Sequence, residues 1–213
     1  MKKIYMILLA VLALSLTFAF VACGGNDDDG GNNTDPVTGI TTYKMEAEYI
    51  NLDGIVGGGL SNAKEGVNMI EDGKNASNGY FVAHTYVEGL TLEFVFEAEE
   101  ACSAELVLSL GSELGDMQLG SDIFAVKLNG TAITYANKTV YDSDFGNMEF
   151  QEISVTSNAQ LAKGKNTVTL VVLKNEYKSG SSGGPLIDYL KIKTTGKITW
   201  TDKTDNPDRR GEI

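Results

Sequence analysis

The sequence predicts an all-β protein, an antiparallel β-sandwich of the jelly-roll type. Apolar and polar residues alternate in many short runs from residue 41 to 195, and glycine-rich breaks separate runs at 57–59 and 179–184. No sustained helical period appears after residue 22. With 213 residues, 42% of them hydrophobic, the chain is long enough to bury one sizeable core.

The first 22 residues have the layout of an export signal. Lys2 and Lys3 precede an apolar run from Ile7 to Val21, which is short for a membrane span. The run ends at a cysteine, so this segment resembles a bacterial lipoprotein signal peptide, after whose removal Cys23 carries lipid. We therefore expect a lipid-anchored, extracytoplasmic protein of the bacterial cell envelope. An ordinary secretory signal with an incidental cysteine is the alternative.

Residues 23–40 are rich in Gly, Asn, Asp and Thr, a composition that cannot bury enough apolar surface to order itself, and we expect a flexible linker. The net charge is −12. Removal of the signal peptide takes away Lys2 and Lys3, which leaves 15 basic against 29 acidic residues and a net charge of −14. This charge argues against nucleic acid as a partner.

The β-sandwich is expected over residues 41–200, followed by a polar C-terminal tail, 201–213. One run ends at Asn129-Gly130, a dipeptide that favours a tight hairpin turn because both residues tolerate positive φ. The clearest strand candidates are residues 92–96, 104–110, 124–128, 153–155 and 167–173.

Three acidic residues suggest a metal site. Glu46 and Glu48 are two residues apart in the run 43–49, so in a strand both carboxylates would point the same way. Asp188 lies two residues before Leu190 and four before Ile192. In a regular strand its carboxylate would therefore point to the same apolar face of the last long strand. Calcium takes six to eight oxygen ligands and would relieve the repulsion between such carboxylates. The alternative is a solvent-facing strand edge.

Five segments, in their order and spacing, resemble carbohydrate-binding module families 6 and 35. They are YKMEAEY, ASNGYFVAH, LNG, LAKGKNTVTLVV and GGPLIDYLKI, and they cover nearly all of residues 41–195. The resemblance implies a jelly-roll β-sandwich that binds glycans without cleaving them and carries a structural calcium ion. Matched residue by residue, it implies Glu46, Glu48 and Asp188 as calcium ligands.

The resemblance also implies a sugar site on loops at one end of the sandwich, where aromatic rings stack on sugar faces and an Asn donates hydrogen bonds. Leu186 stands at that Asn position, so this site is altered or absent. Each candidate ring has a packing role as its alternative. The candidate ligand-binding residues are His84, Tyr86, Tyr141, Phe145 and Tyr177.

The sequence argues against an enzyme. It has one histidine, no nucleophile elbow and no phosphate-binding glycine loop. A glycosidase needs a pair of carboxylates, which could come from Glu97, Glu99 and Glu100. Their clustering between two strands is more typical of a solvated turn. Cys102 reads as a small buried hydrophobe. We expect non-catalytic binding of a polysaccharide, with a structural or protein-interaction domain that has lost the sugar site as the alternative.

Overall fold

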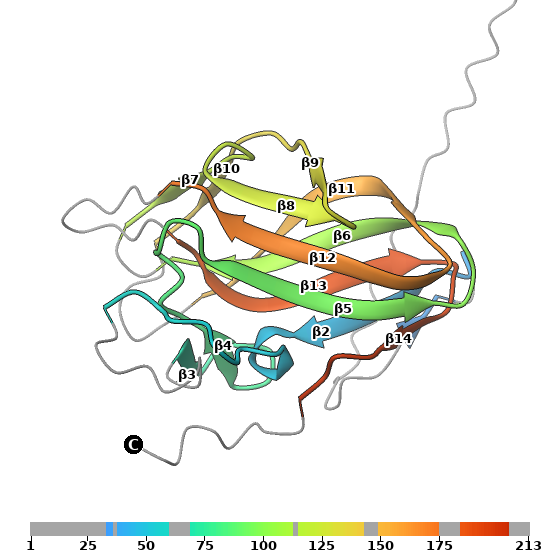
Figure 1. Ribbon diagram of the computed structural model, residues 1–213, viewed down its shortest axis with the longest axis horizontal. Helices are drawn as coiled ribbons and strands as arrows, with labels where there is room; N and C mark the ends of the chain where they lie inside the picture. The colour runs from blue at the N-terminus through green and yellow to red at the C-terminus, as the bar shows by residue number, and fades with distance from the viewer. Residues whose placement is uncertain are drawn as a thin grey trace, which may run out of the picture.

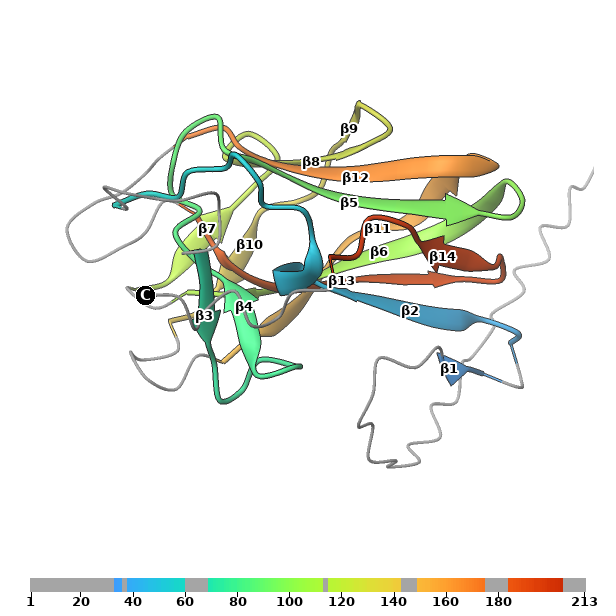
Figure 2. The same ribbon diagram turned by 60° about the horizontal axis from the view of Figure 1, so that its bottom comes forward.

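Two antiparallel β-sheets packed face to face form the framework of the protein in a computed structural model (Figures 1 and 2). The structure describes residues 33–35, 38–59, 69–112, 115–142, 149–174 and 184–204. The predicted antiparallel β-sandwich is confirmed.

One layer is a five-stranded sheet that contains three of the five predicted strands. The turn at Asn129-Gly130 is also confirmed, because φ is 51° at Asn129 and 80° at Gly130 and Leu128 pairs with Thr131 across the hairpin. In spatial order the strands are β14 (Ile198–Trp200), β5 (Thr91–Ala98), β12 (Gly164–Val172), β8 (Phe124–Leu128) and β9 (Thr131–Ile133).

The second layer is organised around β13 (Leu186–Thr194), which pairs with β6 on one edge and with β2 and β4 on the other. A separate small sheet joins β7 (Met117–Leu119) and β10 (Lys138–Val140). The remaining strands of the second layer are β1 (Asn33–Thr34), β2 (Thr41–Glu46), β3 (Ile70–Asp72), β4 (Tyr80–Val82), β6 (Cys102–Gly111) and β11 (Gln151–Leu161).

The core lies between the two layers, which Figure 2 shows nearly edge-on. Burial alternates along β5, because successive side chains of a strand point to opposite faces. Phe94 and Phe96 of β5 meet Leu106 of β6 and Leu190 of β13 in one continuous cluster. Full burial of each such side chain contributes about 1.5–3 kcal/mol.

Asn166 is a fully buried polar residue of β12, and it holds two turns together. Its amide group donates to the carbonyl oxygens of Ala162 and Gly164 and accepts from the Ala162 N–H. It also accepts a hydrogen bond from the side chain of Asn129 in the β8–β9 hairpin. Asn166 therefore ties the β11–β12 turn to the neighbouring hairpin.

Part of the predicted linker 23–40 belongs to the folded domain, since β1 pairs with Thr41 and Thr42 of β2. The predicted signal peptide and Cys23 lie outside the described residues. Within the part of the chain that is described, no helix combines the length and apolar character needed to cross a membrane.

The domain also continues past residue 200. Thr201 donates its backbone N–H to the carbonyl oxygen of Val95, and Thr204 donates its own to Tyr49. The start of the predicted tail 201–213 is therefore docked on the sandwich.

Candidate functional site

The structure brings the three predicted carboxylates together at one end of the second sheet. Glu46 is the last residue of β2, and it pairs in register with Tyr189 of β13, the neighbour of Asp188. Glu48 follows in a 3-10 helix, η1 (Ala47–Tyr49). Antiparallel pairing of β2 with β13 is thus what joins residues more than 140 positions apart.

The predicted inward orientation of Asp188 is wrong. The register of β13 against β6 shifts by one residue between Ile187 and Tyr189, which is a β-bulge at Asp188. Ile187 and Leu190 both lie in the main core, although their positions differ in parity. Asp188 instead accepts a hydrogen bond from Ser109 at 3.0 Å, on the side of β6 away from that core. The bulge has moved the carboxylate to the outer face of the sheet.

The predicted strand arrangement of Glu46 and Glu48 also differs from the structure. Because η1 begins at Ala47, the two carboxylates are not neighbours on one face of a strand. Glu46 lies on the outer face, where its Oε1 is 3.8 Å from the Lys44 ammonium group. Glu48 is only 1% exposed. The two groups still converge, through the turn that follows β2.

Ser77 and Asn78 join the three carboxylates, although neither residue was predicted from the sequence to belong to the site. Ser77 donates its hydroxyl to Glu46 and its backbone N–H to Asp188 at 2.9 Å. Asn78 donates its amide to Glu48 Oε1, also at 2.9 Å. Both residues stand in the segment ASNGYFVAH, so its Asn-Gly turn was a signal that could have found them.

The electrostatics of this carboxylate cluster are unfavourable for three negative charges. Burial raises the pKa of Glu46 and of Asp188, and it raises the pKa of Glu48 to about 7. The charges of Glu46 and Asp188 contribute to this raised pKa of Glu48, while the hydrogen bond from Asn78 opposes the rise. Lys44 lowers the pKa of Glu46 by its positive charge.

The donor set of the cluster suits a hard cation such as calcium, which prefers carboxylate oxygens. Glu48 Oε2 is buried and has no hydrogen-bond partner in the described structure, so one acceptor is available. Among the described residues, however, no three acidic, histidine or cysteine side chains converge on one point as the ligands of a bound ion do. Some side-chain movement would accompany metal binding.

His84 and Tyr86, two of the predicted sugar-binding residues, are half-buried and pack on the glycine-rich segment 57–59. The ring nitrogens of His84 lie 2.9 Å from the Gly58 carbonyl oxygen and 2.8 Å from Glu71 Oε1. A Cβ atom on Gly58 would overlap the Tyr86 ring. Both rings therefore pack against segment 57–59 and help to hold it in place.

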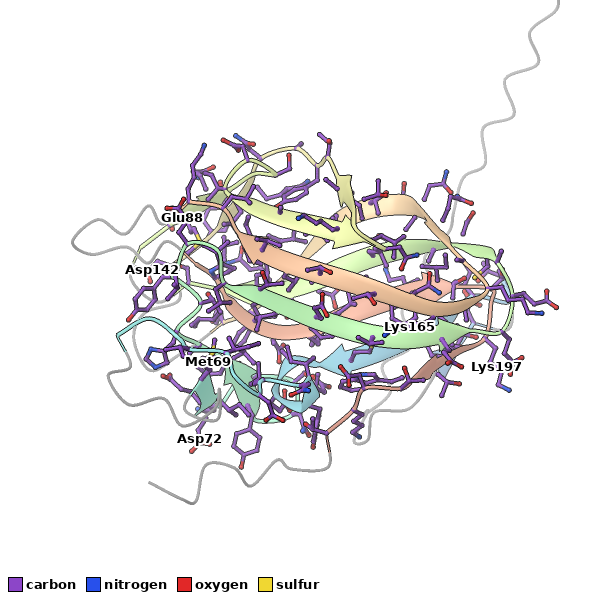
Figure 3. The ribbon with its side chains drawn as sticks, in the orientation of Figure 1. Met69, Asp72, Glu88, Asp142, Lys165 and Lys197 are labelled. Atoms are coloured by element: carbon purple, nitrogen blue, oxygen red, sulfur yellow. The ribbon has the colours of Figure 1, made fainter. Side chains whose placement is uncertain are left out.

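Tyr141 presents the most exposed ring among the described candidates, with 59% of its surface accessible. Figure 3 places its neighbour Asp142 at the same end of the sandwich as Met69, which packs against the same glycine segment as His84. Lys165 and Lys197 mark the opposite end. The two remaining predicted ligand-binding residues, Phe145 and Tyr177, lie outside the described residues.

Leu186 occupies an apolar position. It is 4% exposed and belongs to a small cluster with Phe81 and Ala83 of the β4 region, apart from the main core. Phe150, the residue before β11, packs on the same cluster. The side chain is consequently held by packing and offers no hydrogen bond to a ligand.

No family model matches this chain, and no curated protein does. Among solved structures, the chain is similar to the CBM35 from Cellvibrio japonicus Abf62, with 13% identity and a TM-score of 0.50 over 76% of this chain and 99% of that one. A family 35 carbohydrate binding module from an environmental isolate gives 13% identity and a TM-score of 0.50, over 75% of this chain and 97% of that one.

The chain has the fold of a family 35 carbohydrate-binding module. At this identity the similarity defines the fold alone. It confirms the module-like β-sandwich that the five sequence segments predicted, whereas the carboxylate cluster and the exposed Tyr141 rest on this chain's own geometry.

Proposed function

We propose that this protein binds a polysaccharide without cleaving it. The observation that carries the proposal is the family 35 module fold, because the proteins with which it is shared are named as carbohydrate-binding modules and nearly their whole length is covered. The acidic sequence and the scarcity of catalytic motifs agree with a binding role.

The proposed site is the loop end of the sandwich. Tyr141 would supply an exposed aromatic surface for the apolar face of a sugar ring. Leu186 removes one hydrogen bond that the resemblance implied, which is worth about 0.5–1.5 kcal/mol. We therefore expect weak binding, with dissociation constants on the order of high micromolar to millimolar.

The carboxylate cluster is proposed to hold one calcium ion through Glu46, Glu48 and Asp188. A bound ion would add to the positive charge of Lys44 and offset the repulsion among the three buried carboxylates. Ser77 links Glu46 to Asp188, so the same ion would also stiffen the turn before β4. The expected effect of calcium is on the stability of the loop end.

Cys23 is proposed to carry lipid and to hold the protein at the extracytoplasmic side of the bacterial cell envelope. The support is the layout of residues 1–23, with two lysines, an apolar run and the cysteine. Replacement Cys23→Ser should move the protein from the membrane fraction to the soluble fraction on cell fractionation. Wild-type protein in the soluble fraction would contradict the anchor.

A second function is favoured by one observation, the packed Leu186. If the sugar site is lost, the domain would serve as a structural or protein-interaction module that keeps the fold. A glycan array separates the two functions. Binding to no glycan by protein that is folded in calcium would favour the interaction module.

The test of carbohydrate binding uses the same array with a variant and a matched control. Tyr141→Ala should weaken binding by removing the stacking surface, and Glu97→Ala should not, because Glu97 is exposed on β5 and pairs with Lys165 toward the opposite end of the sandwich. Equal binding by wild type and Tyr141→Ala would remove Tyr141 from the site. Chelator should weaken loop-end binding if calcium stiffens that end.

A further inference from the structure

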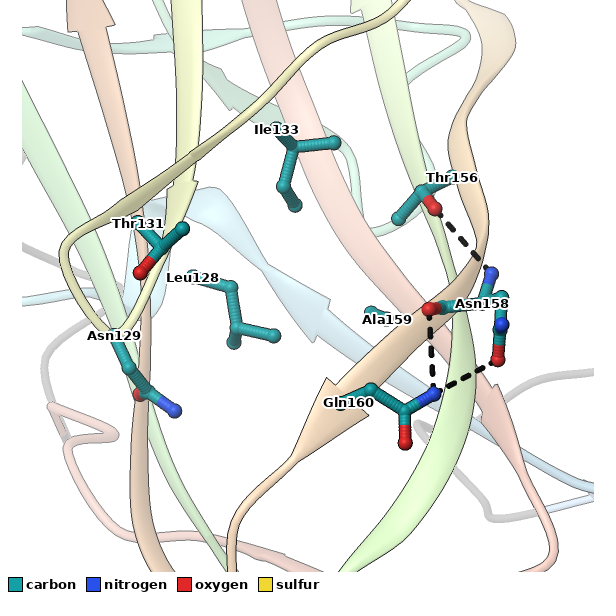
Figure 4. Close-up of a pocket in the computed structure, with 8 residues that line it drawn as sticks. All are labelled: Leu128, Asn129, Thr131, Ile133, Thr156, Asn158, Ala159 and Gln160. Atoms are coloured by element: carbon teal, nitrogen blue, oxygen red, sulfur yellow. Dashed lines mark hydrogen bonds between the residues drawn. The ribbon is translucent and has the colours of Figure 1, made fainter.

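A cleft of about 380 Å³ opens between the edge strands of the two sheets, β9 and β11 (Figure 4). The β8–β9 hairpin forms one wall and the second half of β11 forms the other. The cleft is lined by Leu128, Asn129, Thr131, Ile133, Thr156, Asn158, Ala159 and Gln160. Its volume lies within the range of small-molecule sites, about 300–1,000 Å³.

This cleft is remote from the carboxylate cluster. Ala159 pairs with Ala104 of β6, which in turn pairs with Thr194 at the end of β13. Asp188 lies six residues earlier in β13, a separation of about 20 Å along the strand. A ligand in the cleft would not contact the proposed calcium site.

Two irregularities in β11 shape the wall of the cleft. The register against β6 shifts between Ser154 and Thr156 and again between Thr156 and Ala159, so β11 carries extra residues over this stretch. Because there are two shifts, odd-numbered residues point to the core both before and after them, as Val155 and Ala159 do. Thr156 and Asn158 are thereby placed beside the cleft. Bulges at a sheet edge often re-aim side chains in this way.

The opposite wall is held in place by two hydrogen bonds of the Asn129 side chain. The side chain of Asn129 donates to Asn166 Oδ1 at 2.9 Å and accepts the Thr167 N–H at 2.9 Å. Asn166 is itself fully buried and fixed by its own bonds to the β11–β12 turn. The position of the hairpin wall is therefore set before any ligand arrives.

Several polar groups on the rim remain available. Gln160 donates its amide N–H groups to Ser103 and Asn158, which leaves its Oε1 without a partner among the described residues. The Thr131 hydroxyl and the Asn158 amide nitrogen likewise have no partner within the described part of the chain. The floor is apolar, with Leu128 and Ala159 buried and Ile133 half-buried.

We propose that this cleft between β9 and β11 is a second binding site, and that it takes a neutral saccharide. None of the eight described residues that line it carries a charge, so an anion or a cation would find no counter-charge in the lining. Amide and hydroxyl groups both donate and accept, which suits sugar hydroxyls, and the aliphatic floor suits the C–H face of a ring. The choice of a saccharide rests on the proposed function.

The test is an NMR titration of the ¹⁵N-labelled purified protein with xylotriose, cellotriose, mannotriose and maltotriose, with glucuronic acid as a charged probe. The side-chain amide signals of Asn129, Asn158 and Gln160 report on the cleft. We expect at least one neutral trisaccharide to shift these signals at millimolar concentration. The shifts should be the same in calcium and in chelator, because the cleft lies apart from the carboxylate cluster.

Two variants and one control test the assignment. Gln160→Ala should weaken binding by about 2- to 13-fold, the value of one net hydrogen bond. Ala159→Trp should abolish it by filling the floor. Gln118→Ala should leave it unchanged, since Gln118 is an exposed amide on β7 bonded to Thr139. If Ala159→Trp does not fold, the surface variant Gln160→Ala still tests whether the saccharide binds in the cleft.

Three results would overturn the inference. Saccharide shifts that spare the cleft amides and are lost in Tyr141→Ala would leave the proposed function standing and remove the second site. Cleft shifts with glucuronic acid alone would exclude a neutral ligand. The absence of any saccharide-induced shift, together with a silent glycan array, would remove both the second site and the proposed function.

Discussion

Replacement of Glu48 by glutamine should stabilise the calcium-free protein at high pH. Glu48 is 1% exposed, and burial raises its pKa from the ordinary value of 4.5 to about 7. Between these pH values the folded state binds a proton that the unfolded state has released, so the free energy of unfolding falls as pH rises through this window. Above pH 7, the buried charge of Glu48 lowers the free energy of unfolding by about 3 kcal/mol in total, at about 1.4 kcal/mol per pKa unit.

Glutamine removes this cost while it keeps an oxygen for the hydrogen bond from Asn78. In chelator at pH 8, we expect Glu48→Gln to be more stable than wild type by up to about 3 kcal/mol, and at pH 4.5 the two should be nearly equal. Urea unfolding followed by the fluorescence of Trp200, the single tryptophan, measures both free energies. Trp200 packs edge-on against Tyr49, next to Glu48, and so reports on this region.

Calcium should largely cancel this difference in stability between wild type and Glu48→Gln. At a calcium concentration about 100-fold above its dissociation constant, wild type should gain about 2.7 kcal/mol, and Glu48→Gln should gain little. Glu97→Gln removes the same charge from an exposed position and should change stability by less than about 0.5 kcal/mol. A Glu48→Gln variant less stable than wild type at pH 8 in chelator would refute the argument that the buried charge is costly. Identical wild-type melts with calcium and with chelator would count against the calcium site.

Three further substitutions test packing, each by urea unfolding. Asn166→Ala should cost about 2–4 kcal/mol, because it removes the hydrogen bonds that the buried Asn166 side chain makes with Ala162, Gly164 and Asn129, and a loss below about 1 kcal/mol would show that water replaces them. Leu186→Asn should cost about 3 kcal/mol or more without improving glycan binding, since an amide would be buried among apolar groups; improved binding would contradict this. Gly58→Ala should cost about 1–3 kcal/mol by pushing on the Tyr86 ring, and an unchanged stability would mean that the ring moves freely.

Local features of the sequence were enough to predict the β-sandwich and several of its parts. Alternation in the run 92–96 predicted a half-buried strand, and β5 shows that burial pattern because side chains alternate with a period of two. Asn129-Gly130 predicted a tight turn because these two residues accept positive φ with little cost. Both properties depend on residues that are adjacent in the chain.

The structure places the three carboxylates near one another, but by a geometry that differs from the one that the sequence predicted. Counting parity along β13 placed Asp188 inward, and the β-bulge opposite Ser109 turned it outward. Whether a strand carries an extra residue depends on the partner strand with which it pairs, and β6 lies about 80 residues earlier in the chain. Counting alternate residues along one strand assumes regular pairing, so it cannot show where a bulge lies.

The contacts of Ser77 and the cleft beside β11 were likewise decided only by the tertiary structure. Ser77 meets Asp188 because β4 and β2 both pair with one edge of β13. The cleft exists because two register shifts in β11 fall beside the β8–β9 hairpin of the other sheet. The sequence by itself determined which segments form strands and where one sharp turn lies. The long-range pairing of those strands decided which polar side chains meet, because that pairing is set by packing across the whole core.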